Sequence, residues 1–121
     1  MPADTPPVTD HSAPESAPLL SEYRSDPDMA ELIEFFLQEL AHHAQELGQA
    51  FETGDSRRLR VLAHQLKGAA GGYGYPSISA TAGRLEAGVI ADEADLSSLA
   101  ERVEELIRLC RQAAAGASST Q

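Results

Sequence analysis

The sequence predicts an all-α protein, an antiparallel four-helix bundle with a short extra N-terminal helix. Apolar residues recur every three or four positions in four successive segments, as they do along one face of an amphipathic helix. Turn and capping residues separate these segments by short connections, which favour antiparallel neighbours. No stretch shows the alternation of apolar and polar residues that is typical of a strand. At 121 residues, the chain is long enough to form one domain with a single core.

We expect both ends of the chain to be disordered. Residues 1–17 are acidic and rich in proline, so they cannot bury enough apolar surface to order themselves. Residues 116–121 are small and polar, which is typical of a frayed end. The predicted bundle therefore spans residues 18–115. Its first element is a short helix over residues 18–24, with Leu19 and Leu20 as its apolar contact.

The first long helix is expected to begin at Asp26-Pro27. Asp26 is a candidate N-cap, and proline suits the first helical position. The helix runs to about Thr53. Its predicted buried stripe consists of Met29, Leu32, Ile33, Phe36, Leu40, Leu47 and Phe51.

The second long helix is predicted to follow directly and to end at Ala70 or Gly72. Gly54 stops the preceding helix, and the Asp55 side chain can cap the next one. One side of this second helix carries the apolar residues Leu59, Leu62, Leu66, Ala69 and Ala70.

Two more helices complete the predicted bundle. Pro76 restarts a helix after a glycine-rich turn, and that helix ends near Ala91-Asp92. Its inward residues are Ile78, Ala82, Leu85 and Val89. Asp95 is expected to cap a last helix that runs to about Ala114 and buries Leu96, Leu99, Val103, Leu106 and Cys110.

The charge distribution predicts a surface for an anionic partner. The net charge of −10 argues against nucleic acid and anionic membranes as partners. Against this acidic background, Arg57, Arg58, Arg60 and Lys67 lie close together in one helix, with Asp55 as the acid among them. Such a basic segment marks a place where an anionic group is expected to arrive. The alternative is an ordinary solvated helix face.

Cysteine usage and the absence of sorting signals favour the cytoplasm. Cys110, the single cysteine, cannot form an internal disulfide, which suits a reducing compartment. It falls in phase with the apolar residues of its helix, so we interpret it as a core thiol and not as a nucleophile. No apolar run approaches the ~20 residues of a membrane span, and no signal peptide is visible.

His64 is the candidate functional residue. At ~100° per residue, it lies opposite the apolar stripe of its helix, in the phase of Arg57, Val61 and Gly68. A glycine inside a helix is less favourable than alanine by about 1 kcal/mol, so Gly68 needs a reason. Residue i+4 lies beside His64 on the helix surface, and glycine leaves that space empty. Lys67 at i+3 places an ammonium group next to the imidazole.

The stretch His64-Gln65-Leu66-Lys67-Gly68-Ala69-Ala70 resembles the signature of the histidine-containing phosphotransfer (HPt) domain family. That signature is His-x-Leu-Lys-Gly followed by small residues. It has a further glycine six positions after the first one, and Gly74 corresponds to this second glycine. The resemblance extends to the order of helices over residues 19–115. The chain departs from it at Gly71-Gly72, where many members carry other small or polar residues.

The resemblance implies a carrier in two-component signalling. It implies that His64 accepts a phosphoryl group from a receiver-domain aspartate, or from a kinase, and passes it to another receiver domain. Lys67 would screen the charge of the transferred group, and Gly68 would keep the site open. The implied partners are response-regulator receiver domains and a sensor (hybrid) histidine kinase. We expect the protein to be a monomer.

The expected partner-binding surface is the face of the helix around His64. Its charged and polar members would steer or contact the partner, and an exposed valine would supply apolar contact at its centre. The predicted partner-binding residues are Arg57, Arg60, Val61, Gln65, Gly68 and Gly71.

No cofactor, metal or ATP site is predicted. The sequence has no glycine-rich nucleotide loop, so we do not expect kinase activity. No cluster of acids stands near His64 in the sequence, and the resemblance implies that the partner's aspartate pocket supplies Mg²⁺. Glu39 and His42 have the spacing of a di-metal motif, but it occurs once. His42 is expected to be solvated, and His43 to be a core-edge residue with a hydrogen bond.

The sequence leaves two alternatives to a phosphoryl carrier. The first is a non-catalytic helical-bundle binding module that sequesters a response regulator; loss of the histidine would indicate it, and His64 is present. The second is a purely structural helical module, which leaves the outward His64 and Gly68 without an explanation.

Overall fold

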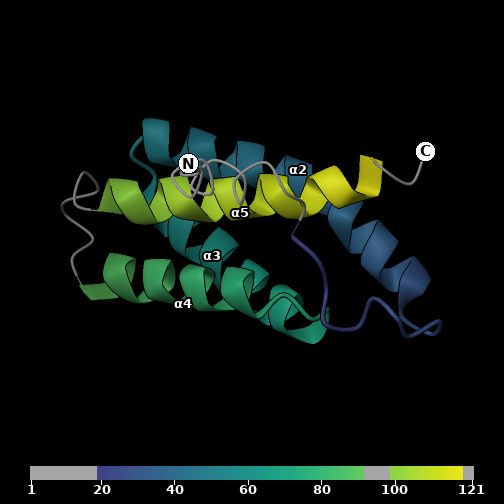
Figure 1. Ribbon diagram of the computed structural model, residues 1–121. Helices are drawn as coiled ribbons and strands as arrows, with labels where there is room; N and C mark the ends of the chain where they lie inside the picture. The colour runs from purple at the N-terminus through teal and green to yellow at the C-terminus, as the bar shows by residue number, and fades with distance from the viewer. Residues whose placement is uncertain (1–18, 92–98, 119–121) are drawn as a thin grey trace, which may run out of the picture.

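The computed structural model describes residues 19–91 and 99–118, and these residues form the predicted bundle (Figure 1). The helices, labelled as in Figure 1, are α2 (Ala30–Glu52), α3 (Ser56–Gly72), α4 (Pro76–Ala91) and α5 (Ala100–Ser118). Successive helices run in opposite directions. The helix α2 packs mainly on α5, and α3 packs mainly on α4. No strand occurs within the described residues, so the predicted all-α class is confirmed.

The core lies between the four helices, and leucine is its most frequent residue. Leu40 and Leu47 of α2, Leu59 of α3, Leu85 of α4 and Leu106 of α5 are completely buried. Packing of this apolar surface is the main term that stabilises a bundle of this size. Cys110 is also fully buried, as predicted, and burial raises the pKa of its thiol to about 12. The thiol is therefore protonated near neutral pH and is a poor nucleophile.

The buried stripe of α2 differs from the predicted one at Leu32. This side chain is 49% exposed, whereas Leu37 and Ala44 are buried. The periodic spacing allowed both assignments, because Leu32 and Leu37 lie on opposite edges of the same apolar stripe. Packing against α5 and α3 decides the matter: the stripe is centred on Ile33, Leu40 and Leu47.

The turn between α2 and α3 has the predicted chemistry. Gly54 has a φ of 71°, in the left-handed region that glycine adopts at a helix C-terminus. The Asp55 carboxylate accepts a hydrogen bond from the backbone N–H of Arg58 at 3.0 Å, which is an N-cap interaction. The start and the end of α3 were therefore predicted correctly, and its N-cap fixes the rotational phase of the side chains that follow.

The short N-terminal helix predicted over residues 18–24 is not found in its described part. The Ser21 hydroxyl donates to the carbonyl of Tyr73 at 2.6 Å, and the N–H of Glu22 donates to the carbonyl of Gly74 at 2.8 Å. The segment binds the turn between α3 and α4, and its internal hydrogen bonds close a turn at Ser21 and form no helix: the N–H of Arg24 donates to the Ser21 carbonyl, and the N–H of Tyr23 donates to the Ser21 hydroxyl. Helix propensity depends on residues that are close in sequence, so it cannot predict hydrogen bonds to such distant partners.

The first long helix begins at Ala30 and not at Pro27. The Asp26 carboxylate accepts from the N–H of Asp28 at 2.9 Å, and the Asp26 carbonyl accepts from the N–H of Met29 at 2.9 Å. Asp26 therefore closes a separate turn ahead of the helix. The N-cap position is occupied by Met29, which makes no side-chain capping bond.

At its C-terminus, α5 continues to Ser118. It therefore runs past residue 115, where the sequence analysis placed the end of the bundle, and residues 116–118 are helical. The predicted cap Asp95 and the predicted core residue Leu96 lie outside the described residues. So do the predicted N-terminal tail 1–17 and the last three residues of the predicted C-terminal tail 116–121. Within the part of the chain that the structure describes, no helix is long and apolar enough to span a membrane.

Candidate functional site

His64 lies on the outward face of α3, as its phase predicted. The side chain is 69% exposed, because the opposite face of the helix buries Leu59, Leu66 and Ala70 in the core. Val61 is also exposed, at 42%. A Cβ atom placed on Gly68 would meet no heavy atom within 4 Å, so the space beside the imidazole is open. The geometry leaves room for another molecule to reach His64.

A carboxylate from the neighbouring helix holds the imidazole. Nδ1 of His64 lies 2.9 Å from Oε2 of Glu86 on α4, a hydrogen-bond distance. The Glu86 side chain is only 15% exposed, so its position is fixed by packing much more than that of the imidazole. Glu86 was not among the predicted site residues. No spacing within a single helix links positions 64 and 86.

The hydrogen bond to Glu86 selects one tautomer of the imidazole. A carboxylate accepts hydrogen bonds, so Nδ1 carries the proton and Nε2 carries the lone pair of the neutral ring. The described residues give Nε2 no polar partner. His64 therefore presents a nucleophilic nitrogen at an exposed position, held in orientation through its other nitrogen.

Lys67 lies beside the same carboxylate. Its Nζ atom is 3.9 Å from Oε1 of Glu86, whereas the imidazole contacts Oε2. The ammonium group is therefore near His64, as predicted, but its ion-pair partner is Glu86. One carboxylate thus connects the two residues of α3 that the resemblance singled out.

The remaining predicted partner-binding residues lie on the exposed surface of α3. Arg57, Arg60, Gln65 and Gly71 are all exposed. Arg57 and Val61 line a shallow depression at the start of the helix, together with Asp55 and Arg58. Gly71 is at the α4 side of the helix, where a Cβ atom would lie 3.4 Å from Oγ of Ser79. The structure places these residues along one helix but shows no partner against them.

The comparison with known families agrees with the geometry. The sequence matches the family model of the Hpt domain over residues 31–117, which includes α3 and α4 with His64 and Glu86. The chain belongs to the Hpt domain family. Searches of curated proteins and of solved structures each gave no significant match. Hpt domains are phosphotransfer carriers in two-component phosphorelays, and not kinases; they interact with receiver domains and histidine kinases.

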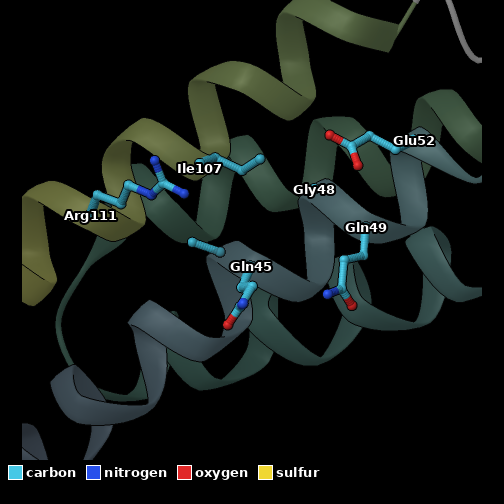
Figure 2. Close-up of a pocket in the computed structure, with 7 residues that line it drawn as sticks. Gln45, Gly48, Gln49, Glu52, Ile107 and Arg111 are labelled. Atoms are coloured by element: carbon cyan, nitrogen blue, oxygen red, sulfur yellow. The ribbon is translucent and has the colours of Figure 1, made fainter.

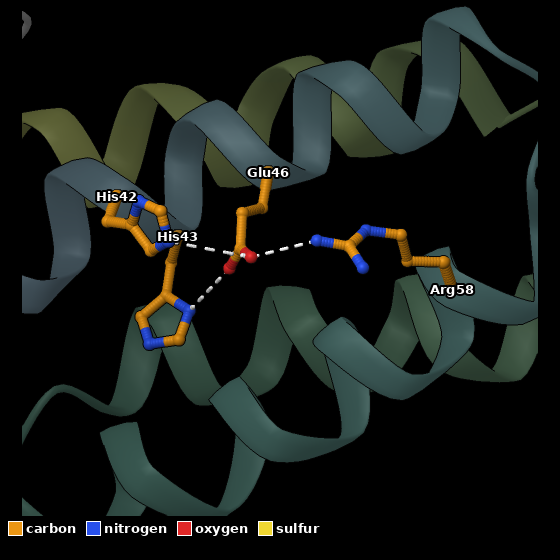
Figure 3. Close-up of polar contacts among 4 residues, drawn as sticks. All are labelled: His42, His43, Glu46 and Arg58. Carbon is orange, nitrogen blue, oxygen red and sulfur yellow. Dashed lines mark hydrogen bonds and ion pairs between the residues drawn. The ribbon is translucent and has the colours of Figure 1, made fainter.

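A second histidine cluster of this Hpt domain links α2 to α3 (Figure 3). The Glu46 carboxylate accepts a hydrogen bond from Arg58 of α3 at 2.8 Å, and it lies 3.5 Å from Nε2 of His42 and 3.9 Å from Nδ1 of His43. His42 is exposed, as expected. The hydrogen bond expected for His43 is not found, since its Nδ1 atom has no partner within hydrogen-bond distance among the described residues. Arg58 is engaged here, away from His64.

No metal site appears in the described part of the Hpt domain. Residues 19–91 and 99–118 contain no group of three or more histidine, cysteine or acidic side chains that could hold an ion. Another shallow pocket lies between α2 and α5 (Figure 2), and it contains none of the predicted site residues. Its lining consists of Ala44, Gln45, Gly48, Gln49, Glu52, Ile107 and Arg111.

Proposed function

We propose that this Hpt domain takes up a phosphoryl group on Nε2 of His64. The donor is the phosphoaspartate of a receiver domain, or a histidine kinase, and the acceptor is the aspartate of a second receiver domain. One observation carries the proposal: His64 is exposed on a rigid helix, and Glu86 binds its Nδ1 atom at 2.9 Å. That arrangement frees Nε2 for attack on an incoming phosphorus atom.

The transfer from a phosphoaspartate balances without a separate base. The lone pair on Nε2 attacks phosphorus and forms the N–P bond. The bond between phosphorus and the aspartate oxygen breaks, and its electron pair stays on the departing carboxylate. Nδ1 keeps its proton, so the phosphorylated ring is a cation, and the neighbouring Glu86 carboxylate offsets that charge. Transfer to the next receiver domain is the reverse of the same step.

Most of the charge of the transition state would be neutralised from both sides of the interface. Phosphoryl transfer depends mainly on positioning and on neutralising the equatorial oxygens. Lys67 is the cation of this chain nearest to His64 in sequence on the exposed face, and we propose that it screens the transferred group. Mg²⁺ would be held by the aspartate pocket of the receiver domain.

The proposed docking surface is the exposed face of α3 around His64. Arg57 and Arg60 would attract the acidic pocket of a receiver domain, and Val61 would supply apolar contact beside the imidazole. Gln65, Gly68 and Gly71 would lie under the docked partner. The presence of glycine at position 68 has a steric explanation, since any side chain there would occupy the open space next to His64.

The decisive experiment follows a phosphoryl group from a labelled receiver domain to this chain. The wild-type protein should acquire acid-labile phosphate, whereas His64→Gln should acquire none and should keep its helical circular dichroism spectrum. His42→Gln is the matched control, because His42 is also an exposed helical histidine next to a glutamate. It should behave as wild type.

The outcome also separates the proposed function from its alternative. Label on His64→Gln would mean that another residue is the acceptor. A wild-type protein that binds receiver domains but never acquires label would instead support a binding module that sequesters the response regulator.

A further inference from the structure

Three successive contacts join α3 to α4 along the side of α3 that carries His64. His64 lies against Glu86 at one end, with 2.9 Å between Nδ1 and Oε2. At the other end, Oγ of Ser79 donates a hydrogen bond to the carbonyl of Lys67 at 2.8 Å. Between these two contacts, the side chain of Lys67 faces Gly83. The register of the two helices thus places a glycine opposite the lysine.

The stem of Lys67 lies along the backbone of α4 at Gly83. A Cβ atom on Gly83 would be 3.4 Å from Cδ, 3.7 Å from Cε and 3.9 Å from Cγ of the lysine. The ammonium group then reaches Glu86, one turn further along α4, with 3.9 Å between Nζ and Oε1. A Cβ atom at position 83 would thus be in van der Waals contact with the stem, and a longer side chain would compete with the lysine for the adjoining space.

Core packing does not explain the glycine. The buried residues of α4 are Ile78, Thr81, Ala82, Leu85 and Val89, and Gly83 is not among them. A glycine within a helix destabilises it by about 1 kcal/mol relative to alanine. The heavy atoms nearest to a Cβ atom at position 83 all belong to the Lys67 side chain.

We propose that Gly83 and Glu86 position Lys67 for phosphoryl transfer, an inference that rests on the proposed function. Gly83 provides a seat for Lys67, by which we mean the open surface of α4 on which the methylene groups of the lysine lie. Glu86 holds the ammonium group beside His64 before the partner docks. A lysine side chain loses considerable rotamer freedom when it is fixed, so fixing it in advance lowers the entropic barrier of the transfer step. Once the phosphoryl group is on Nε2, it carries more negative charge than the Glu86 carboxylate, and Lys67 pairs with the phosphoryl group instead.

The first experiment asks whether Gly83 restricts the Lys67 side chain in the free protein. It compares Gly83→Gln with Ala80→Gln. Ala80 is an exposed position of the same helix, so both variants add the same side chain to α4. Side-chain ¹³C relaxation should show greater mobility of the Lys67 Cε methylene in Gly83→Gln, and unchanged mobility in Ala80→Gln. Equal mobility of Lys67 in wild type and in Gly83→Gln would overturn the proposal.

The second arm measures transfer from a saturating phosphorylated receiver domain. We expect both Gly83→Gln and Lys67→Ala to lower the first-order rate constant roughly tenfold; the loss should be smaller than for a fully buried electrostatic donor, because Lys67 is half exposed. In the Lys67→Ala background, Gly83→Gln should cause no further loss. Ala80→Gln should transfer at the wild-type rate.

The double variant distinguishes positioning from obstruction. If the glutamine at position 83 merely blocked the partner, its effect would persist when Lys67 is absent, and the proposal would be wrong. Failure of wild type to acquire phosphate would overturn the proposed function and the role of Lys67 in it. The relaxation measurement would still decide whether Gly83 seats the lysine.

Discussion

Glu86 of α4 lies 2.9 Å from Nδ1 of His64 on α3, although 22 positions separate the two residues in the sequence. The carboxylate has two consequences for the imidazole. It fixes the tautomer in which Nε2 is the nucleophile, and it places a negative charge beside the ring that becomes cationic on phosphorylation. The reactive properties of the histidine therefore depend on a helix to which it does not belong.

Replacement of Glu86 by glutamine should shift the phosphoryl equilibrium away from His64. The amide oxygen can still accept the hydrogen bond from Nδ1, but the charge that offsets the cationic ring is lost. We expect the fraction of phosphate on this chain, at equilibrium with a receiver domain, to fall about fivefold, which corresponds to ~1 kcal/mol. Glu101→Gln, at an exposed position of α5, is the control. An unchanged equilibrium in Glu86→Gln would show that the charge is not coupled to the reaction.

Substitutions at Gly68 should move stability and transfer in opposite directions. A Cβ atom fits there without contact, so Gly68→Ala should raise the free energy of unfolding by up to ~1 kcal/mol. Gly68→Gln should also favour the helix, but its side chain would occupy the space beside His64 and slow the transfer. Thermal unfolding and transfer kinetics, with Ala41→Gln on α2 as the control, would test this. Wild-type kinetics in Gly68→Gln would remove the steric explanation of the glycine.

The salt dependence of binding should separate the contribution of charge on α3 from that of apolar contact. Charge reversal at Arg57 or Arg60 should slow association with a receiver domain, and the deficit should shrink as salt rises, because exposed charges are screened over ~10 Å at 0.1 M. Val61→Asp should weaken the complex at all salt concentrations. Arg108→Glu on α5 changes the net charge equally and should have little effect. Equal, salt-independent losses for the three α3 variants would place the docking surface elsewhere.

Gly74 should tolerate substitution much less well than Gly54. Both have positive φ angles, 86° and 71°, so alanine is strained by about 1–2 kcal/mol at either position. At Gly54 nothing lies within 4 Å of a new Cβ atom, whereas at Gly74 it would lie 2.6 Å from Oγ of Ser21. Chemical denaturation should therefore show a larger loss of stability for Gly74→Ala than for Gly54→Ala. Equal losses would mean that the segment around Ser21 contributes nothing to the stability of the turn.

The sequence by itself determined the four long helices and the direction in which His64 points. Helical periodicity needs only neighbours three and four positions away, so the bounds of α3 and α4 and the exposure of His64 followed from local spacing. The same spacing identified the open position at Gly68. Local signals were weaker at the start of α2, where the Asp26 side chain closes a turn and does not cap the helix.

Only the tertiary structure decided which residues of different helices meet. The register between α3 and α4 places Glu86 against His64 and Gly83 against Lys67, and it places Ser21 against the turn at Tyr73. Each of these contacts joins residues that are far apart in the chain. Their distances depend on how the buried side chains of two helices interlock, and the periodicity of a single helix contains no information about that register.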